Sequence, residues 1–196
     1  MSDAVRSIRT VTITERTPAL VCFGGLPATG KSTVAGRVAV ALAAAYVRID
    51  TIETAVARAE GDHAATNDWE LPPGYAVGYD MAREQLRLGL DVVAESVNPL
   101  EETRQAWRQA ADDAGAATFD VEVVCSDPAE HRRRAEGRTV DVPGLILPTW
   151  DQILEREYEP WDRDRLVIDT SAASPADAAQ AVLAGLSDAR SGGGSH

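Results

Sequence analysis

The chain has 196 residues, of which 44% are apolar and 26% are charged, and its formal net charge is −12. This length and composition predict a globular domain with a sizeable core, and the negative charge argues against broad binding to nucleic acid or anionic membranes, which are polyanions. No apolar run reaches the length of a membrane span, and Met1 to Thr14 lack the apolar core of a signal peptide, so we expect a cytoplasmic protein.

Short apolar runs alternate with longer helical patterns along the chain. Residues 5–14 alternate like an edge strand, but residues 1–18 fit a loose N-terminal arm equally well. We then predict strands at 19–24, 46–49, 91–95, 119–125 and 165–169, and helices at 31–45, 51–60, 75–90, 99–115, 127–137, 149–159 and 175–189. This alternation predicts an α/β fold with a five-stranded parallel sheet flanked by helices. Residues 191–196 have the composition of a flexible linker or tag remnant.

Two local features support this reading. Three predicted helices begin with a capping side chain, a proline and a carboxylate two residues later, at Asn98-Pro99-Leu100-Glu101, Asp127-Pro128-Ala129-Glu130 and Ser174-Pro175-Ala176-Asp177. Cys22 and Cys125 lie in apolar runs, and we expect two buried reduced thiols, as in a cytoplasmic protein.

The stretch GLPATGKS, residues 25–32, matches G-x-x-x-x-G-K-[ST] between a predicted strand and a predicted helix. Its backbone N–H groups and the helix start would hold phosphate oxygens, and Ser32 would offer a hydroxyl to Mg²⁺. Lys31 is the single lysine among 19 basic residues, at a place where a compact charge suits the β- and γ-phosphates better than the planar fork of arginine. The motif predicts binding of ATP with Mg²⁺ through Gly25, Ala28, Thr29, Gly30, Lys31, Ser32 and Thr33.

Carboxylates follow two of the predicted strands. Asp50 would lie at the carboxyl edge of the sheet, where it either accepts the proton of an attacking hydroxyl or caps the next helix. Glu95 ends the third strand and either orients Mg²⁺ or pairs with a buried arginine. Asn98 is either a helix cap or a contact to substrate.

A basic run, His131-Arg132-Arg133-Arg134-Ala135-Glu136-Gly137-Arg138, stands out in this acidic chain. Arg133, Arg134 and Arg138 are candidates for neutralising the charge of a transferred phosphoryl group, if residues of about 127–148 form a lid. The alternative is a solvated face of an ordinary helix.

With these residues in view, the chain resembles the small P-loop kinases grouped with zeta-type toxins, chloramphenicol phosphotransferase and polynucleotide 5′-kinase, and above all bacterial sequences described as AAA family ATPases. The resemblance covers about residues 19–188. It implies a P-loop NTPase fold with a kinase domain over 19–190, Asp50 facing the acceptor hydroxyl, and an arginine-bearing lid helix. Several relatives have an arginine where this chain has Glu53, which argues against an anionic acceptor.

Two stretches fit no regular element, 61–74 and 139–148, and the acceptor is expected near them, at about 61–80 and 139–161. Candidate contacts are Asp50, Glu53, His63, Trp69, Tyr75 and Asn98, although His63 also fits a solvated loop. Tyr79 and Trp107 have the spacing of helix core positions. The leading hypothesis is a kinase that phosphorylates a hydroxyl of a metabolite, nucleoside or antibiotic. The alternatives are a 5′-hydroxyl nucleic-acid kinase and a nucleotide-binding regulatory protein without phosphotransfer.

Overall fold

The computed structural model describes residues 16–60 and 73–192. The strands are β1 (Ala19–Gly24), β2 (Ala45–Arg48), β3 (Val92–Glu95), β4 (Ala117–Val124) and β5 (Leu166–Asp169). The helices are α1 (Lys31–Leu42), α2 (Ile49–Glu60), α3 (Pro73–Arg87), α4 (Glu101–Asp112), α5 (Pro128–Gly137), α6 (Trp150–Leu154) and α7 (Pro175–Gly192). Two candidate acceptor contacts, His63 and Trp69, lie outside the described residues, as do residues 5–14 and most of the tail.

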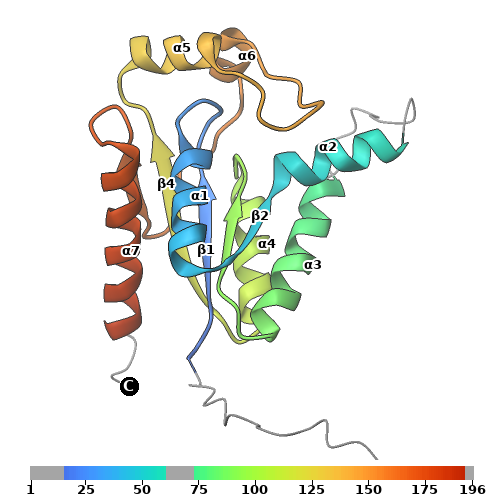
Figure 1. Ribbon diagram of the computed structural model, residues 1–196, viewed down its shortest axis with the longest axis vertical. Helices are drawn as coiled ribbons and strands as arrows, with labels where there is room; N and C mark the ends of the chain where they lie inside the picture. The colour runs from blue at the N-terminus through green and yellow to red at the C-terminus, as the bar shows by residue number, and fades with distance from the viewer. Residues whose placement is uncertain (1–15, 61–72, 193–196) are drawn as a thin grey trace, which may run out of the picture.

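All five strands run parallel, in the order β2-β3-β1-β4-β5, with β1 at the centre (Figure 1). β1 and β3 are buried along their whole length, as expected for a parallel sheet that is covered on both faces. Phe23 of β1 and Arg48 of β2 both lie opposite Glu95 of β3, so the carboxyl ends of these strands meet at one edge. The predicted α/β fold is confirmed.

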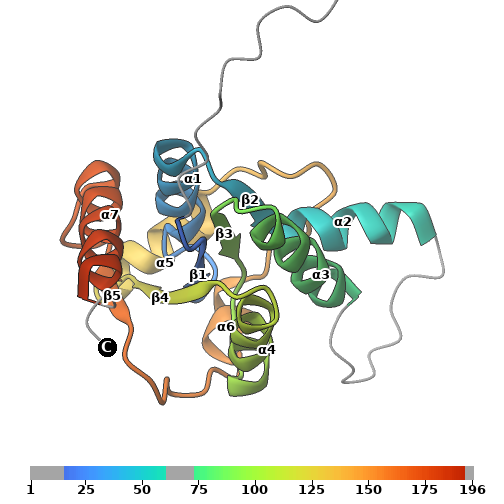
Figure 2. The same cartoon turned by 90° about the horizontal axis from the view of Figure 1, so that it is seen from below.

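Helices cover the sheet on both faces (Figure 2). Phe23 belongs to the core under α1 and α7, whereas Cys22 points to the opposite core, under α3 and α4. Tyr79 and Trp107 are buried in this second core with their rings in an edge-to-face contact, as predicted. Cys22 and Cys125 are buried free thiols, also as predicted. None of the helices within residues 16–60 and 73–192 has the length and apolar character that crossing a membrane requires.

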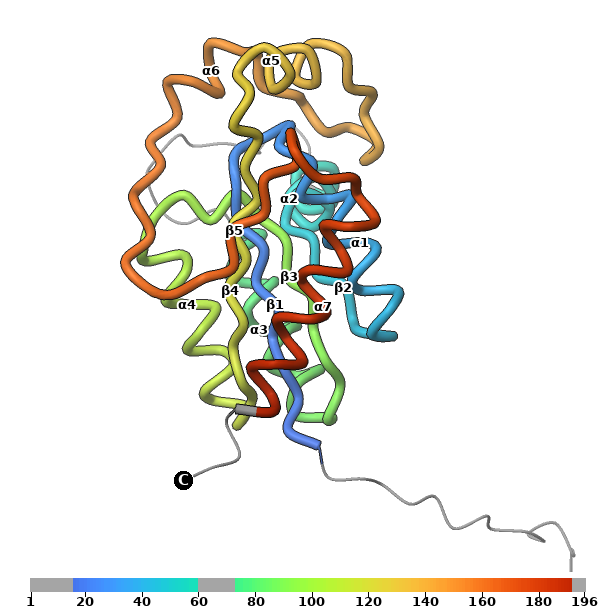
Figure 3. Tube along the Cα trace, turned by 90° about the vertical axis from the view of Figure 1, so that its left-hand side faces the viewer, coloured from blue at the N-terminus to red at the C-terminus, as the bar shows by residue number. Residues whose placement is uncertain are grey.

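The helices α5 and α6 lie across the carboxyl edge of the sheet, beyond the end of β1 (Figure 3). The predicted arginine-bearing helix therefore exists at the edge where phosphate is expected, and its role as a lid stays a prediction. Asp127 caps α5 by accepting from the N–H groups of Ala129 and Glu130, and Ser174 accepts from the N–H of Asp177 at the start of α7.

The third predicted cap is wrong. The helix α4 begins at Glu101, its N-cap residue is Leu100, and the N–H of Glu101 donates to Glu159 Oε2 at 2.6 Å. The helix α6 ends at Leu154, five residues earlier than predicted, because the following chain makes other contacts: the N–H of Glu159 donates to the carbonyl of Pro99 at 2.8 Å. Residues 155–165 are thereby tied to the start of α4 instead of continuing the helix.

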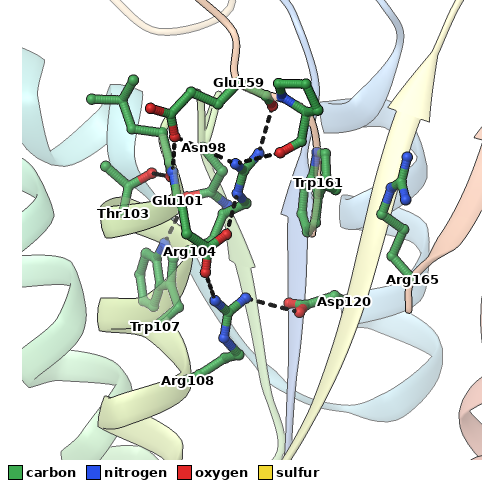
Figure 4. Close-up of polar contacts among 12 residues, drawn as sticks. Asn98, Glu101, Thr103, Arg104, Trp107, Arg108, Asp120, Glu159, Trp161 and Arg165 are labelled. Carbon is green, nitrogen blue, oxygen red and sulfur yellow. Dashed lines mark hydrogen bonds and ion pairs between the residues drawn. The ribbon is translucent and has the colours of Figure 1, made fainter. Parts of the chain in front are cut away.

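A buried arginine fastens this segment. We call Arg104, Glu101, Glu159, Pro160 and Trp161 the Arg104 network (Figure 4). The guanidinium of Arg104 is fully buried and donates to Glu101 Oε2 at 3.2 Å and to the carbonyls of Glu159 and Pro160 at 3.1 and 3.2 Å. It also lies over the indole of Trp161, 4.8 Å from the ring centroid.

The edge of that indole, at Cζ2 and Cη2, touches the end of β1. A Cβ atom on Gly24 would lie 2.7 Å from the Trp161 ring, so only glycine fits there. The Arg104 network therefore joins residues 155–165 to the strand that leads into the phosphate-binding motif.

Candidate active site

The loop between β1 and α1 takes a path that its glycines permit. Gly25 has a φ of 141°, and a Cβ atom there would lie 2.2 Å from the carbonyl oxygen of Val123. Gly30, with a φ of 93°, precedes the first residue of α1. These are the places where the predicted phosphate-binding motif requires glycine, and the loop runs directly into a helix N-terminus, as the motif needs.

Two contacts that the sequence did not reveal hold this loop from outside. Thr170, which follows β5, donates to the carbonyl of Thr29 at 2.6 Å. His131 of α5 is buried, and its Nε2 donates to the carbonyl of Pro27 at 2.8 Å. The ring of His131 also makes an edge-to-face contact with Trp150 of α6. The loop is thus bound to the β5 end and to α5.

Lys31 opens α1 and is only 6% exposed. Burial lowers the pKa of its ammonium group, and the carboxylates of Glu95 and Asp50 act in the opposite direction. Both carboxylates that the sequence proposed therefore lie near enough to influence this lysine. Lys31, Asp50 and Glu95 therefore lie close together at the carboxyl edge of the sheet.

Glu95 has three partners. It accepts from Ser32 Oγ at 2.5 Å and from the hydroxyl of Tyr46, and its Oε2 lies 3.5 Å from Arg48 Nε. Both alternatives from the sequence therefore have support: the carboxylate touches the hydroxyl of the motif and also pairs with an arginine. A hydroxyl and a carboxylate side by side are hard oxygen ligands, which suit Mg²⁺.

Asp50 lies within the first turn of α2, because β2 ends at Arg48 and the helix begins at Ile49. Its carboxylate is 33% exposed, and Oδ2 lies 3.6 Å from Arg48 Nη2. Arg48 also binds Asp141, at 2.5 Å, so this arginine joins β2 to the segment that follows α5. The expected position of Asp50 at the strand end is wrong by two residues, but the carboxylate still lies at the carboxyl edge.

Glu53 lies one turn further along α2, packed so closely on α3 that a Cβ atom on Gly74 would lie 2.3 Å from its Cγ. Burial, together with the charge of Asp50, raises the pKa of Glu53 to about 7. Tyr75 of α3 is buried, and burial raises the pKa of its hydroxyl to about 12. Asp50, Glu53 and Tyr75, three of the predicted acceptor contacts, are therefore close together.

Asn98 is a structural residue and not a helix cap. It is fully buried, with a φ of 50°, a conformation that asparagine tolerates better than most residues. Its amide donates to the carbonyl of Phe23 at 3.0 Å, and its Oδ1 accepts from the indole of Trp107, also at 3.0 Å. Since its amide is fully used in joining β1 to α4, the structure gives no support for Asn98 as an acceptor contact.

The predicted arginines divide into two kinds. Arg134 donates to the hydroxyl and carbonyl of Thr170 at 2.7 and 3.0 Å, and its Nη1 would lie 3.7 Å from a Cβ on Gly30. Arg138 is half-buried, and its interaction with Asp50 partly offsets the lowering of its pKa by burial. The side chain of Arg133 is 73% exposed and binds only Glu130 within the described residues, so it lies on the solvated face.

The decisive comparison is with a protein family. The sequence model of an AAA domain matches residues 20–157. The chain belongs to this AAA domain family. No curated protein sequence matches it.

Solved structures share the fold of this AAA domain. They include a sugar kinase from a Janibacter species (16% identity, TM-score 0.66, 90% of this chain and 98% of that chain). The APS kinase of Mycobacterium tuberculosis in complex with AMPPNP and APS also matches (22% identity, TM-score 0.58, 87% and 98%). So does Kti12 of Chaetomium thermophilum in complex with ADP-AlF3 (18% identity, TM-score 0.65, 86% and 97%). The P-loop kinase fold is confirmed, whereas the narrower resemblance to zeta-type toxins and chloramphenicol phosphotransferase stays a prediction.

Proposed function

We propose that the protein is a kinase that transfers the γ-phosphate of ATP to a hydroxyl of a small molecule. One observation carries this proposal: Asp50, a partly exposed carboxylate, lies beside the phosphate-binding loop and influences Lys31. A carboxylate in that place can accept the proton of an attacking hydroxyl.

The phosphate groups would be held by the loop N–H groups and by Lys31. Ser32 and Glu95 would hold Mg²⁺, since a hydroxyl and a carboxylate already in contact provide two oxygen ligands. When bound, Mg²⁺ neutralises part of the charge on the phosphate oxygens.

In the transfer step, the acceptor hydroxyl gives its proton to the carboxylate of Asp50. The acceptor oxygen forms a bond to the γ-phosphorus while the bond from that phosphorus to the bridging oxygen of ADP breaks, and ADP leaves with the bond electrons. Asp50 later releases the proton to water. Arg134, next to Gly30, and Arg138, near Asp50, would stabilise the charge on the γ-phosphate oxygens during this exchange.

The net charge of −12 supports a small acceptor over a nucleic acid, whose phosphates need a basic path to the site. The folds of the APS kinase and of the Janibacter sugar kinase support an acceptor of this size. The fold of Kti12 leaves a regulatory nucleotide-binding protein as the rival to be tested.

The test is mass spectrometry of a cell-metabolite and antibiotic pool incubated with Mg-ATP and either the wild type or Asp50→Asn. The proposal predicts a species one phosphate heavier that only the wild type produces, while both proteins bind ATP equally well. ATP binding without any phosphorylated product would contradict it and would favour the regulatory alternative.

A further inference from the structure

Several buried polar atoms near Asp50 have no hydrogen-bond partner among the described residues. They include Glu53 Oε1, Ser96 Oγ and Arg138 Nε. Ser96 directly follows β3 and is only 3% exposed. Buried polar groups in folded proteins are nearly always paired, so unpaired ones that gather at one place need an explanation.

These atoms come from separate elements that meet at Asp50. Glu53 lies three residues after Asp50, and residues with this spacing share one face of a helix. Tyr75 of α3 lies next to both Glu53 and Ser96: burial raises the pKa of its hydroxyl, the hydroxyl of Ser96, within hydrogen-bonding reach, lowers it, and the charge of Glu53 raises it. Arg138 interacts with Asp50 from the segment after α5. Three sides of the site therefore present unsatisfied hydrogen-bonding atoms.

The chemistry of these atoms restricts the ligand. A carboxylate oxygen such as Glu53 Oε1 needs a donor, and the hydroxyl of Ser96 can either donate or accept. An anionic substituent offers no donor, and both Asp50 and Glu53 would repel it. A cationic substituent would meet Arg138 and Arg156, which influence Asp50 and Glu53 respectively. Uncharged hydroxyl groups suit the site best.

Building on the proposed kinase function, we propose that the acceptor is an uncharged polyhydroxyl compound, and that Glu53 and Ser96 bind a second hydroxyl next to the one that Asp50 receives. Glu53 is then a residue that determines specificity, and Asp50 is the proton acceptor. The two hydroxyls lie on neighbouring carbon atoms of the acceptor or close to one another, because Asp50 and Glu53 are one helical turn apart.

Residues 138–145 lie on α2, where Gly144 would place a Cβ atom 3.3 Å from the methyl of Thr54. Asp141 of this segment binds Arg48, and its side chain is 60% exposed. The segment is thereby joined to both α2 and β2.

The first test separates the metabolite pool by charge before the reaction. An anion-exchange resin at neutral pH divides the pool into an anionic fraction and a fraction of neutral and cationic compounds, and a cation-exchange resin divides the latter again. Each fraction is incubated with Mg-ATP and the wild type. The inference predicts a phosphorylated product in the neutral fraction. A product only in the anionic or cationic fraction would overturn this inference and leave the kinase standing, whereas no product in any fraction would contradict the proposed function and this inference with it.

The second test assigns the role of Glu53 with the product-forming compound. In Glu53→Ala the KM for that acceptor should rise about 10–100-fold, because a hydrogen bond to a charged group is lost. The KM for ATP should stay within about twofold, and Glu53→Gln should recover part of the loss. Glu84→Gln, on the exposed end of α3, is the matched control and should behave as the wild type.

An equal rise of both KM values in Glu53→Ala, or an unchanged acceptor KM, would show that Glu53 is only a packing residue. Deoxy analogues of the acceptor give a further check. Removal of the second hydroxyl should raise the acceptor KM of the wild type by the same factor as Glu53→Ala does. It should raise the acceptor KM of Glu53→Ala hardly at all. Additive losses would overturn the proposed contact.

Discussion

Two of the places where the protein shields charged side chains, the Arg104 network and the surroundings of Asp50, differ in how completely their hydrogen bonds are formed. In the Arg104 network, Nε, Nη1 and Nη2 of Arg104 each have an acceptor, and the guanidinium is packed on Trp161. Around Asp50, by contrast, Glu53 Oε1, Ser96 Oγ and Arg138 Nε have no partner among the described residues. Both regions are polar and shielded, but only the second still has hydrogen-bonding capacity to offer.

This difference distinguishes the two regions without reference to any sequence motif. A fully paired network rigidifies the fold, and its loss should be measured as lost stability. An incompletely paired cluster is costly to the free protein and is explained when a ligand completes it. The predictions below use variants that should affect one region and leave the other unchanged.

The largest effect is expected for Asp50→Asn. The amide cannot accept the proton of the acceptor hydroxyl, so kcat should fall about 10²–10⁴-fold, the range for loss of a general base. Steady-state rates with the identified acceptor measure this fall, and calorimetric titration with ATP checks that nucleotide affinity is retained. A parallel loss of ATP binding would show that Asp50 holds the site together and does not act on the acceptor.

Arg104→Met should affect stability and not chemistry. The substitution leaves the carbonyls of Glu159 and Pro160 without this donor, leaves Glu101 without its partner and removes the cation from the Trp161 face, and we expect a loss of about 3–5 kcal/mol in the free energy of unfolding. Urea denaturation measures it. Arg132→Met, which loses one exposed ion pair with Glu136, is the matched control and should change stability by less than about 0.5 kcal/mol.

The contrast between the Arg104 network and the surroundings of Asp50 would be wrong if Arg104→Met, assayed well below its melting temperature, lost phosphotransfer as completely as Asp50→Asn. The Arg104 network would then belong to the active site through Trp161 and Gly24.

The arginines of α5 offer a sharper version of the same contrast. Arg134→Gln removes a charge next to Gly30 and Thr170, so kcat should fall about 10²-fold, as for loss of one donor to developing charge. Arg133→Gln removes a charge that points to solvent and should change kcat by less than about twofold. Equal effects of the two substitutions would mean that α5 turns when the nucleotide binds.

The smallest effect concerns pH. The pKa of Glu53 is raised from 4.5 to about 7 by burial and by Asp50, with Arg156 opposing and the Tyr75 hydroxyl close by. A raised pKa means that the folded state binds the proton more tightly than the unfolded state. The stability from protonated Glu53 is therefore present below pH 4.5 and is lost as the pH rises through about 7.

Glu53→Gln stays neutral and should escape this loss. Its melting temperature relative to the wild type should increase between pH 5 and pH 8, by about 2–4 °C for each kcal/mol recovered in a chain of this size. Scanning calorimetry across that range checks the sign. A difference that does not vary with pH would mean that Glu53 is ionised throughout.

The conformation of the loop between β1 and α1 could be predicted from the sequence because eight consecutive residues determine it. Gly25, Gly30, Lys31 and Ser32 lie where their motif requires, since the backbone geometry that binds phosphate is local. The sheet could be predicted equally well, because strands that are buried on both faces have a clear apolar pattern. Asp50 and Glu95 could be found as carboxylates next to those strands.

The rest of the site depends on pairs that are far apart in the chain. His131 and Pro27 are 104 residues apart, Thr170 and Thr29 are 141 apart, and Arg48 and Asp141 are 93 apart. No local pattern predicts such contacts. The prediction that Asn98 caps a helix was wrong for the same reason. The residues around it have the pattern of a helix cap, but its side chain is hydrogen-bonded to Phe23 and Trp107 instead.

The most direct measurement is a crystal structure of Asp50→Asn with Mg²⁺, ATP and the identified acceptor. The account predicts that one acceptor hydroxyl lies within about 3 Å of the residue 50 side chain and in line with the γ-phosphate. A second hydroxyl should bind Glu53 and Ser96, with Lys31 on the phosphates and Arg104 unchanged. An acceptor that binds elsewhere, with Glu53 and Ser96 still unpaired, would contradict the account.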